Sequence, residues 1–296
     1  MEGYYNTCLL LIGTEITPPT NHYLALEIEK PISREKLNDP QAFIQEVKNK
    51  GGFGFLAHPG DTGNKLLKIT SRPWHNFAHE GYHGIEIWNH LTDINNNITS
   101  IPKLLQAILN PLAGLKGPNK NILRKWDELG DKRHIVAIGG VDAHGVRVKL
   151  VGFSLVLFPY EKVFKTIRTH VLTRSPFTGE FMKDKNKIIQ SLIKGRCYIN
   201  QALLGQEPNF LFYLRTEHGI FNMGDELVQP NLGVFHISLA ERAFITLLMD
   251  GNIIATGDNC KMHHPLIGKG VYRVKIEKKI KNKYYPWIFS NPIFVR

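Results

Sequence analysis

The sequence predicts an α/β domain followed by a smaller all-β domain, and three observations support this. In the first half, short apolar runs typical of buried strands alternate with segments of helical spacing. Several of these runs end in His, Asp or Glu, as strands of α/β folds do where they carry a site. From Gly195 onward, short alternating strands are separated by Gly, Asn and Pro. We therefore expect an α/β domain over 1–159, a helical linker over 160–204 and a small all-β sandwich over 205–296.

The composition is that of a globular protein. The chain has 296 residues, enough for two domains, with 43% hydrophobic and 21% charged residues. No stretch reaches the roughly 20 apolar residues that span a bilayer, so no membrane span is expected. The three cysteines (Cys8, Cys197 and Cys260) form neither a CxxC motif nor a disulfide framework. They favour a reducing, cytoplasmic location.

The net charge of +11 is typical of a solvated basic surface and also suits anionic substrates. No zinc finger, RNP motif or long basic helix accompanies it, so a nucleic-acid partner is not expected.

In the first half, apolar alternation predicts strands at 7–12, 22–28, 53–57, 84–89, 134–138 and 151–158. Helical spacing predicts helices at 40–50, 101–109, 121–129, 161–172 and 185–194. The apolar run 8–12 is interpreted as a core strand, because no basic segment precedes it as in a signal peptide. In the second half, strands are expected at 209–216, 232–239, 244–249, 252–255, 271–277 and 288–296, with Asp250-Gly251 as a hairpin turn.

Five ligand-type side chains stand at or near the ends of expected strands. They are Glu15, His22, His58, Asp142 and His144. Pro59 favours an extended backbone at His58. Asp142 and His144 are two residues apart, so they can leave the same face of an extended segment.

Imidazoles and carboxylates together suit Zn²⁺, Mn²⁺ or Fe²⁺. In a site with two metals, a carboxylate bridges the ions, histidines complete the coordination, and a bound hydroxide attacks the substrate. The structural alternative for each residue is ordinary, with His22 capping a turn and His58 packed in the core. Their occurrence on successive strand ends favours the metal site.

Motifs along nearly the whole chain resemble, in the right order, those of the PHP (polymerase and histidinol phosphatase) metallohydrolase superfamily. They are Gly13-Thr-Glu15-Ile-Thr17, His22-Tyr-Leu-Ala-Leu26, Ala57-His58-Pro59 and Asp142-Ala-His144. The segments Gly84-Ile-Glu-Ile-Trp-Asn89, Trp126-Asp127, Gly195-Arg-Cys-Tyr198 and Pro286-Trp-Ile-Phe-Ser-Asn-Pro-Ile293 further resemble the CehA/McbA-type branch.

This resemblance implies a distorted (β/α)7 TIM-like barrel with two or three divalent metals, followed by a β-rich domain, and hydrolysis of a small phosphoester or another ester. Glu15 would bridge the metals, and His22, His58, Asp142 and His144 would be terminal ligands, Asp142 and His144 also being catalytic. Glu86 and Asn89 would lie near the pocket without binding metal. Arg72, Trp74 and Lys116 are also available there, although surface positions are the expectation for them.

The sequence departs from the family at its start, because the His-x-His motif of the family's first strand is absent. The expected barrel is therefore incomplete. Three explanations compete: a fragment with a misplaced start, which we favour; a degenerate protein with one metal or none; and a barrel completed by another chain. A fragment would leave room for a signal peptide upstream. The alternative functions are a non-catalytic binding module and a metal-dependent carboxylesterase or amidase. The oligomeric state is left open.

Overall fold

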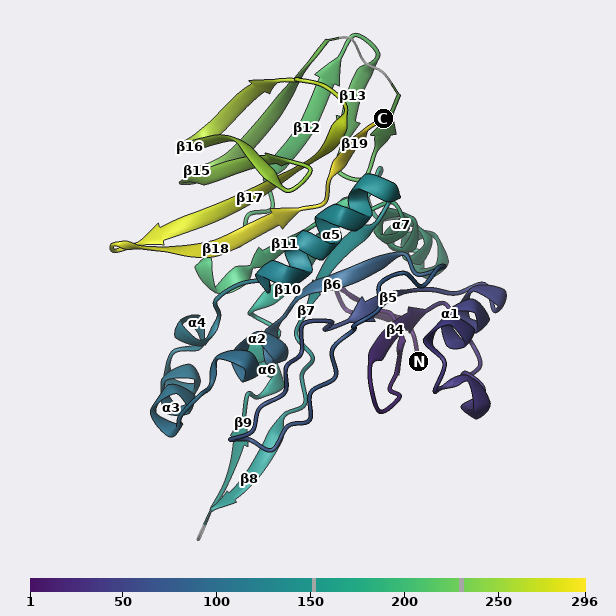
Figure 1. Cartoon of the computed structure of the whole chain (residues 1–296), viewed down its shortest axis with the longest axis vertical. Coiled ribbons are helices and arrows are strands. Elements are labelled where there is room, and N and C mark those ends of the chain that lie inside the picture. The colour runs from purple at the N-terminus through teal and green to yellow at the C-terminus, as the bar shows by residue number, and fades with distance from the viewer. Residues whose placement is uncertain (151–152, 229–231) are drawn as a thin grey trace.

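The computed structural model describes residues 1–150, 153–228 and 232–296. It has a mixed α/β architecture, as the sequence predicts, with one five-stranded sheet, one ten-stranded sheet and two small two-stranded sheets. Figure 1 shows the ten-stranded sheet at one end of the molecule and the five-stranded sheet below it, with helix α5 (Lys120–Lys132) running between them.

The five-stranded sheet carries the strand ends that matter for function. Its order is β3 (Thr14–Ile16), β4 (His22–Leu26), β5 (Phe53–Ala57), β6 (Gly84–Asn89) and β7 (Val136–Gly140). The pairs β3–β4 and β4–β5 are antiparallel, whereas β5–β6 and β6–β7 are parallel. The carboxyl ends of the three parallel strands therefore meet at one edge, where open α/β sheets bind ligands.

Helix α1 (Pro40–Asn49) shows how local sequence sets these elements. The side chain of Asp39 accepts a hydrogen bond from the N–H of Ala42, and Pro40 occupies the first helical turn, where no N–H is needed. Phe43, Ile44 and Val47 are buried, at the spacing of one helical face. The helix then leads into β5, every residue of which is buried.

The free edge of β7 is covered by side chains rather than by another strand of the same sheet. Asn291 accepts from the N–H of Ala137 at 2.7 Å and donates to its carbonyl at 2.8 Å. Thr169 Oγ1 bonds the N–H and the carbonyl of Gly139 in the same way. These side chains thus supply hydrogen-bond partners for main-chain groups that an unpaired edge strand would leave free. Within the described residues, the strands do not close a barrel.

The ten-stranded sheet forms the second core. The central path runs β10 (Ile167–Val171), β11 (Cys197–Gln201), β18 (Lys283–Ser290), β17 (Gly270–Ile280), β15 (Gly233–Met249), β12 (Leu211–Thr216) and β13 (Gly219–Asn222). The remaining strands are β14 (Glu226–Leu227), β16 (Asn252–Pro265) and β19 (Ile293–Val295). All belong to one hydrogen-bonded sheet, so the expected two-layer sandwich stays a prediction.

The hairpin turn at Asp250-Gly251 is confirmed. Met249 pairs with Asn252, and both turn residues have positive φ, 51° and 78°. This is the backbone of the tight hairpin turn for which Asp-Gly is typical.

Two expected elements of the first half are wrong. The apolar run 7–12 is not a core strand, because it lies largely in an exposed hairpin of β1 (Gly3–Tyr5) and β2 (Cys8–Leu10), with Leu10 and Ile12 about half exposed. The expected helix 161–172 is instead the short α6 (Tyr160–Val163) followed by β10. The expected strand 151–158 is confirmed over its described part as β9 (Phe153–Leu157), which pairs with β8 (Val146–Leu150) in a separate two-stranded sheet; residues 151–152 lie outside the described chain.

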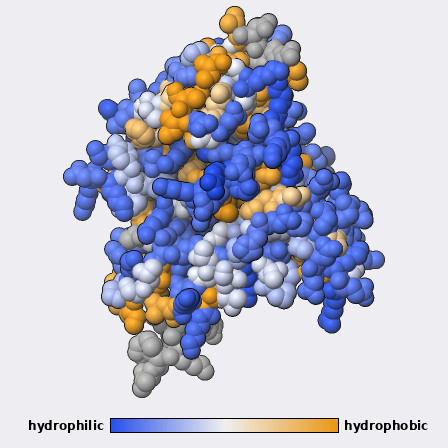
Figure 2. Space-filling model, viewed as in Figure 1, coloured by the Kyte–Doolittle hydropathy of each residue, from blue (hydrophilic) through white to orange (hydrophobic). Residues whose placement is uncertain are grey.

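Four further helices complete the structure: α2 (His90–Asn97), α3 (Ile101–Leu109), α4 (Pro111–Gly114) and α7 (Phe181–Ile193). No helix of the described chain is both long and apolar enough to cross a bilayer. Figure 2 shows a largely hydrophilic face with hydrophobic areas over the far end of the ten-stranded sheet and over α3, where Leu105 and Leu109 are exposed.

Candidate metal centre

Three of the five sequence-predicted ligands lie together. His22 Nδ1 lies 2.8 Å from Glu15 Oε1 and 3.1 Å from His58 Nε2, and the last two atoms are 3.2 Å apart. The three donor atoms thus form a small triangle. Among the residues that the structure describes, this is the one group of three or more such side chains whose ligand atoms converge.

The strand pairing brings these residues together. Glu15 lies in β3, His22 begins the neighbouring β4, and His22 pairs with Ala57 at the end of β5, directly before His58. Trp74 fixes the first residue of β4 from outside the sheet, because its indole N–H donates to the carbonyl of His22 at 2.7 Å. Trp74 is itself buried and packs edge-on against Phe43 of α1.

The backbone at His58 differs from the expectation. Pro59 was expected to keep His58 extended, but φ at His58 is +29°. Its N–H donates to the buried carboxylate of Glu86 at 2.8 Å, and its carbonyl accepts from Asp61 N at 3.0 Å. These tertiary bonds outweigh the local preference, and such backbone strain is most often found at functional sites.

The donor set fits a divalent transition metal. Imidazole and carboxylate ligands bind such ions at about 2.0–2.2 Å, which in a tetrahedron places neighbouring donors about 3.4 Å apart. The observed separations of 2.8–3.2 Å are slightly shorter, as expected for donors that share protons. A small outward movement of the three side chains would therefore accommodate one ion.

The electrostatics of the triad also favour a cation. Burial lowers the pKa of His58, but Glu15, Glu86 and Asp142 outweigh this and raise that pKa to about 9. Hydrogen bonds from His22 and His58 lower the pKa of Glu15. The same carboxylates would attract a metal ion, whose binding to His58 requires the neutral imidazole and so releases a proton.

Glu86 holds the main chain of the triad residue His58 in place. Its carboxylate accepts from the N–H of His58 and, at 3.0 Å, from the side chain of Asn89. Burial raises the pKa of Glu86 to about 7, although the charge of His58 and these bonds lower it. Gly140 leaves room for this carboxylate, since a Cβ there would lie 2.3 Å from Glu86 Oε1. Asn89 also caps helix α2, because its Oδ1 accepts from Thr92 N.

Asp142 and His144 line the same pocket as the triad but do not join it. His144 Nε2 and Asp142 Oδ1 form an ion pair at 2.9 Å, and His144 is largely exposed. Asp142 follows β7 with φ of +49°, so it too is held in a strained conformation.

The pocket over the triad has a volume of about 470 Å³, in the range of small-molecule sites. It is mainly apolar, with Leu67, Ile69 and Phe158 among its walls, and Arg72 adds a cation. The sequence predicts a surface position for Arg72, and its place in the lining of this pocket could not be predicted from the sequence alone.

The sequence reasoning missed the role of Trp74. Trp74, expected at the surface, is 3% exposed and acts on His22 through a main-chain carbonyl. Lys116 is exposed, as expected, and lines a neighbouring pocket beside α2 and α5 that His58 and Glu86 also line. The hydrogen bond from Trp74 Nε1 joins residues that are 52 positions apart, and no pattern in the sequence indicates it.

No protein-family model matches this chain, and neither a curated protein nor a solved structure is significantly similar to it.

Proposed function

We propose that the protein is a metal-dependent hydrolase acting on a small phosphoester, with Glu15, His22 and His58 as metal ligands. The observation that carries this proposal is the converging triad at the edge of the five-stranded sheet where β5 ends, inside a pocket that also contains Arg72, Asp142 and His144. The resemblance of the motifs to the PHP superfamily supports the same chemistry, and with it a barrel-like fold with more than one Zn²⁺, Mn²⁺ or Fe²⁺.

A bound divalent ion of this kind supplies a hydroxide near neutral pH and neutralises charge on the substrate. The chain's own residues would divide the remaining tasks. Arg72 would bind the anionic ester, because its guanidinium matches phosphate geometry. Asp142 orients His144, whose imidazole can donate a proton to the leaving oxygen. Glu86 holds His58 in place through the main chain.

The test combines metal content with turnover. The full chain, purified without chelator, should bind at least one equivalent of Zn²⁺ or Mn²⁺ by elemental analysis and hydrolyse p-nitrophenyl phosphate. His58→Ala and Glu15→Gln should lose the metal and at least about 100-fold of the activity. Far-UV circular dichroism checks that both variants remain folded.

His75→Ala is the matched control, because His75 is an exposed histidine outside the pocket. It should retain metal and activity. A wild-type chain without metal, or His58→Ala activity equal to that of the control, would contradict the proposal. Metal binding without turnover on any phosphate, carboxylic ester or amide would favour the binding-module alternative.

A further inference from the structure

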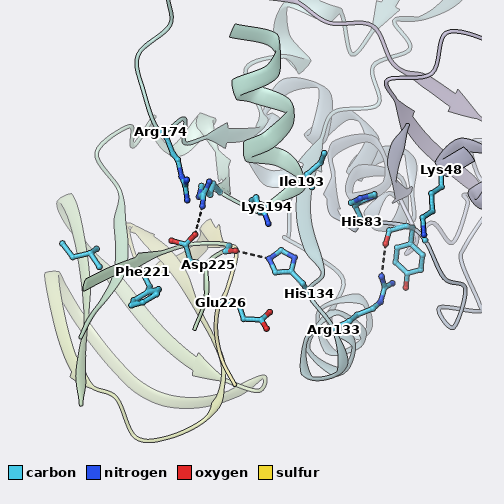
Figure 3. A pocket seen from close by; sticks show the side chains of 15 residues that line it. Lys48, His83, Arg133, His134, Arg174, Ile193, Lys194, Phe221, Asp225 and Glu226 are labelled. Carbon is cyan, nitrogen blue, oxygen red and sulfur yellow. Dashed lines mark hydrogen bonds and ion pairs between the residues drawn. The ribbon is translucent and has the colours of Figure 1, made fainter. Parts of the chain in front are cut away.

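A further pocket, of about 890 Å³, lies between the two large sheets. Figure 3 shows its lining, with Arg174 and Lys194 on one side, Lys48 and Arg133 on the other, and His134 between them. Lys48 belongs to α1, Arg133 follows α5 and Lys194 follows α7. Parts of the chain that are distant in sequence therefore build this pocket together.

Four of its cations have no carboxylate partner. Across the described ranges, Lys48, Arg133, Arg174 and Lys194 form no ion pair. Arg133 stacks on the Tyr82 ring at 4.1 Å and donates to the carbonyl of Tyr82, contacts that leave its charge unneutralised.

The acidic residues of the pocket are too few to balance these cations. Asp225 is already paired with a fifth cation, Arg196, at 2.8 Å, and Glu226 is the other carboxylate in the lining. Burial, and then the charges of Arg133 and Lys48, lower the pKa of His83 in the same lining. A neutral imidazole in this position agrees with a positive local potential.

This pocket is distinct from the metal centre. His83 directly precedes β6, and His134 lies two residues before β7, so the pocket lies at the amino ends of the parallel strands. The triad lies at their carboxyl ends. A six-residue strand such as β6 spans about 17 Å, which separates the two sites.

We propose that this pocket binds a small, multiply charged anion carrying two or more phosphate or carboxylate groups. Arg174 and Lys194 would bind it from one wall, and Lys48 and Arg133 from the other. Charge-assisted hydrogen bonds from these side chains would supply most of the affinity. Because the ligand would contact both walls, its binding also stabilises the fold by linkage.

The proposal is tested by isothermal titration calorimetry on the metal-free full chain at low ionic strength. The probes are inorganic tripolyphosphate and, separately, citrate. Saturable binding of either supports the proposal, and the stronger probe identifies the anionic group. The double variant Lys194→Gln/Arg174→Gln should weaken binding at least about tenfold, since each lost contact involves a charged group.

Two controls separate a built site from general electrostatics. Lys261→Gln/Lys281→Gln removes the same charge from exposed positions away from the pocket and should change affinity less than about twofold. His58→Ala, in the metal centre, should bind the probe as the wild type does. The proposal would be overturned if neither probe bound, or if the two double variants lost the same amount of affinity. It would also be overturned if His58→Ala lost affinity for the probe.

Discussion

At the residue scale, Trp74 links the core to the candidate metal centre. Its indole N–H donates to the main-chain carbonyl of His22, the residue whose Nδ1 lies closest to Glu15. Trp74 is buried, so water cannot replace this bond in the folded state. Groups that orient a ligand in this way usually affect metal affinity almost as strongly as the ligands.

Trp74→Phe should therefore weaken Zn²⁺ binding about tenfold while leaving the fold intact, because phenylalanine keeps the apolar packing and removes only the N–H donor. A competition titration with a chelator of known affinity measures this change. Trp126→Phe is the matched control, since Trp126 is also buried and its N–H donates to the Ile135 carbonyl at 3.2 Å, with no contact to the triad. Equal effects of both substitutions would contradict the role given to Trp74.

The approach of His22 and His58 was predictable from the sequence, because His22 begins β4, His58 follows β5, and strand ends of one sheet meet. Glu15, His22 and His58 do converge, although Glu15 lies in the middle of β3, and their binding of a metal stays a prediction. The positive φ of His58 was not predictable, because it depends on Glu86, 28 residues away. Asp142 and His144 reach the same pocket but pair with each other. The spacing of Asp142 and His144 indicated that both side chains leave the same face of the chain. It could not indicate which side chain each would pair with.

At the element scale, one carboxylate organises the start of helix α7. Asp184 is fully buried and accepts hydrogen bonds from Thr178 N, Gly179 N and the hydroxyl of Tyr4, and Lys187 pairs with it at 3.0 Å. The carboxylate thus joins the loop before α7, the helix and the N-terminal hairpin. Burial raises the pKa of Asp184, but these hydrogen bonds outweigh it and leave that pKa below its ordinary value.

Asp184→Asn should lower the melting temperature by about 5 °C or more at pH 7, because an amide cannot accept all of these bonds. A lowered folded-state pKa means that the ionised carboxylate stabilises the protein above the unfolded pKa of about 3.8. That stabilisation is lost as the pH falls below this value. The difference between variant and wild type should therefore shrink below about pH 4 in thermal scans.

Asp39→Asn provides the comparison for this experiment. Asp39 caps α1 through a single hydrogen bond at 3.2 Å, and asparagine is an equally good cap. Its melting temperature should stay within a degree or two of the wild type. A loss of melting temperature as large as that of Asp184→Asn would show that any aspartate at the start of a helix has this effect.

The elements with a complete local signal were predicted well. Helix α3 has the predicted bounds, and β5 and β6 are as expected, because apolar run length and flanking residues define them. The segment 161–172 has apolar residues that fit a helix, yet 167–171 forms β10 because it pairs with β11. The run 7–12 is apolar and still exposed. In both cases tertiary pairing, which a local pattern does not contain, decides the structure.

At the scale of the whole molecule, polar contacts join the two large sheets. Arg273 of β17 donates two hydrogen bonds to Asp127 of α5, at 2.6 and 2.8 Å, and lies over the ring of Trp126. Both charged groups are mostly buried, Arg273 being 4% exposed. Arg296 adds two bonds to main-chain carbonyls at the end of α5, and Asn291 covers the edge of β7. The two sheets are therefore expected to unfold as one unit.

Arg273→Met tests this coupling. Removing the guanidinium leaves Asp127 buried without a partner, which costs about 3 kcal/mol or more in the free energy of unfolding. The double variant Asp127→Asn/Arg273→Met should recover part of that loss, because no unpaired charge remains. Urea unfolding followed by tryptophan fluorescence and by circular dichroism measures both effects.

Arg242→Met serves as the control, since Arg242 pairs with Asp258 at the surface and should contribute less than about 1 kcal/mol to the free energy of unfolding. In Arg273→Met the two probes should no longer give coincident transitions, as expected when sheets lose their shared contacts. Equal costs for Arg273→Met and Arg242→Met would show that the buried pair does not hold the sheets together.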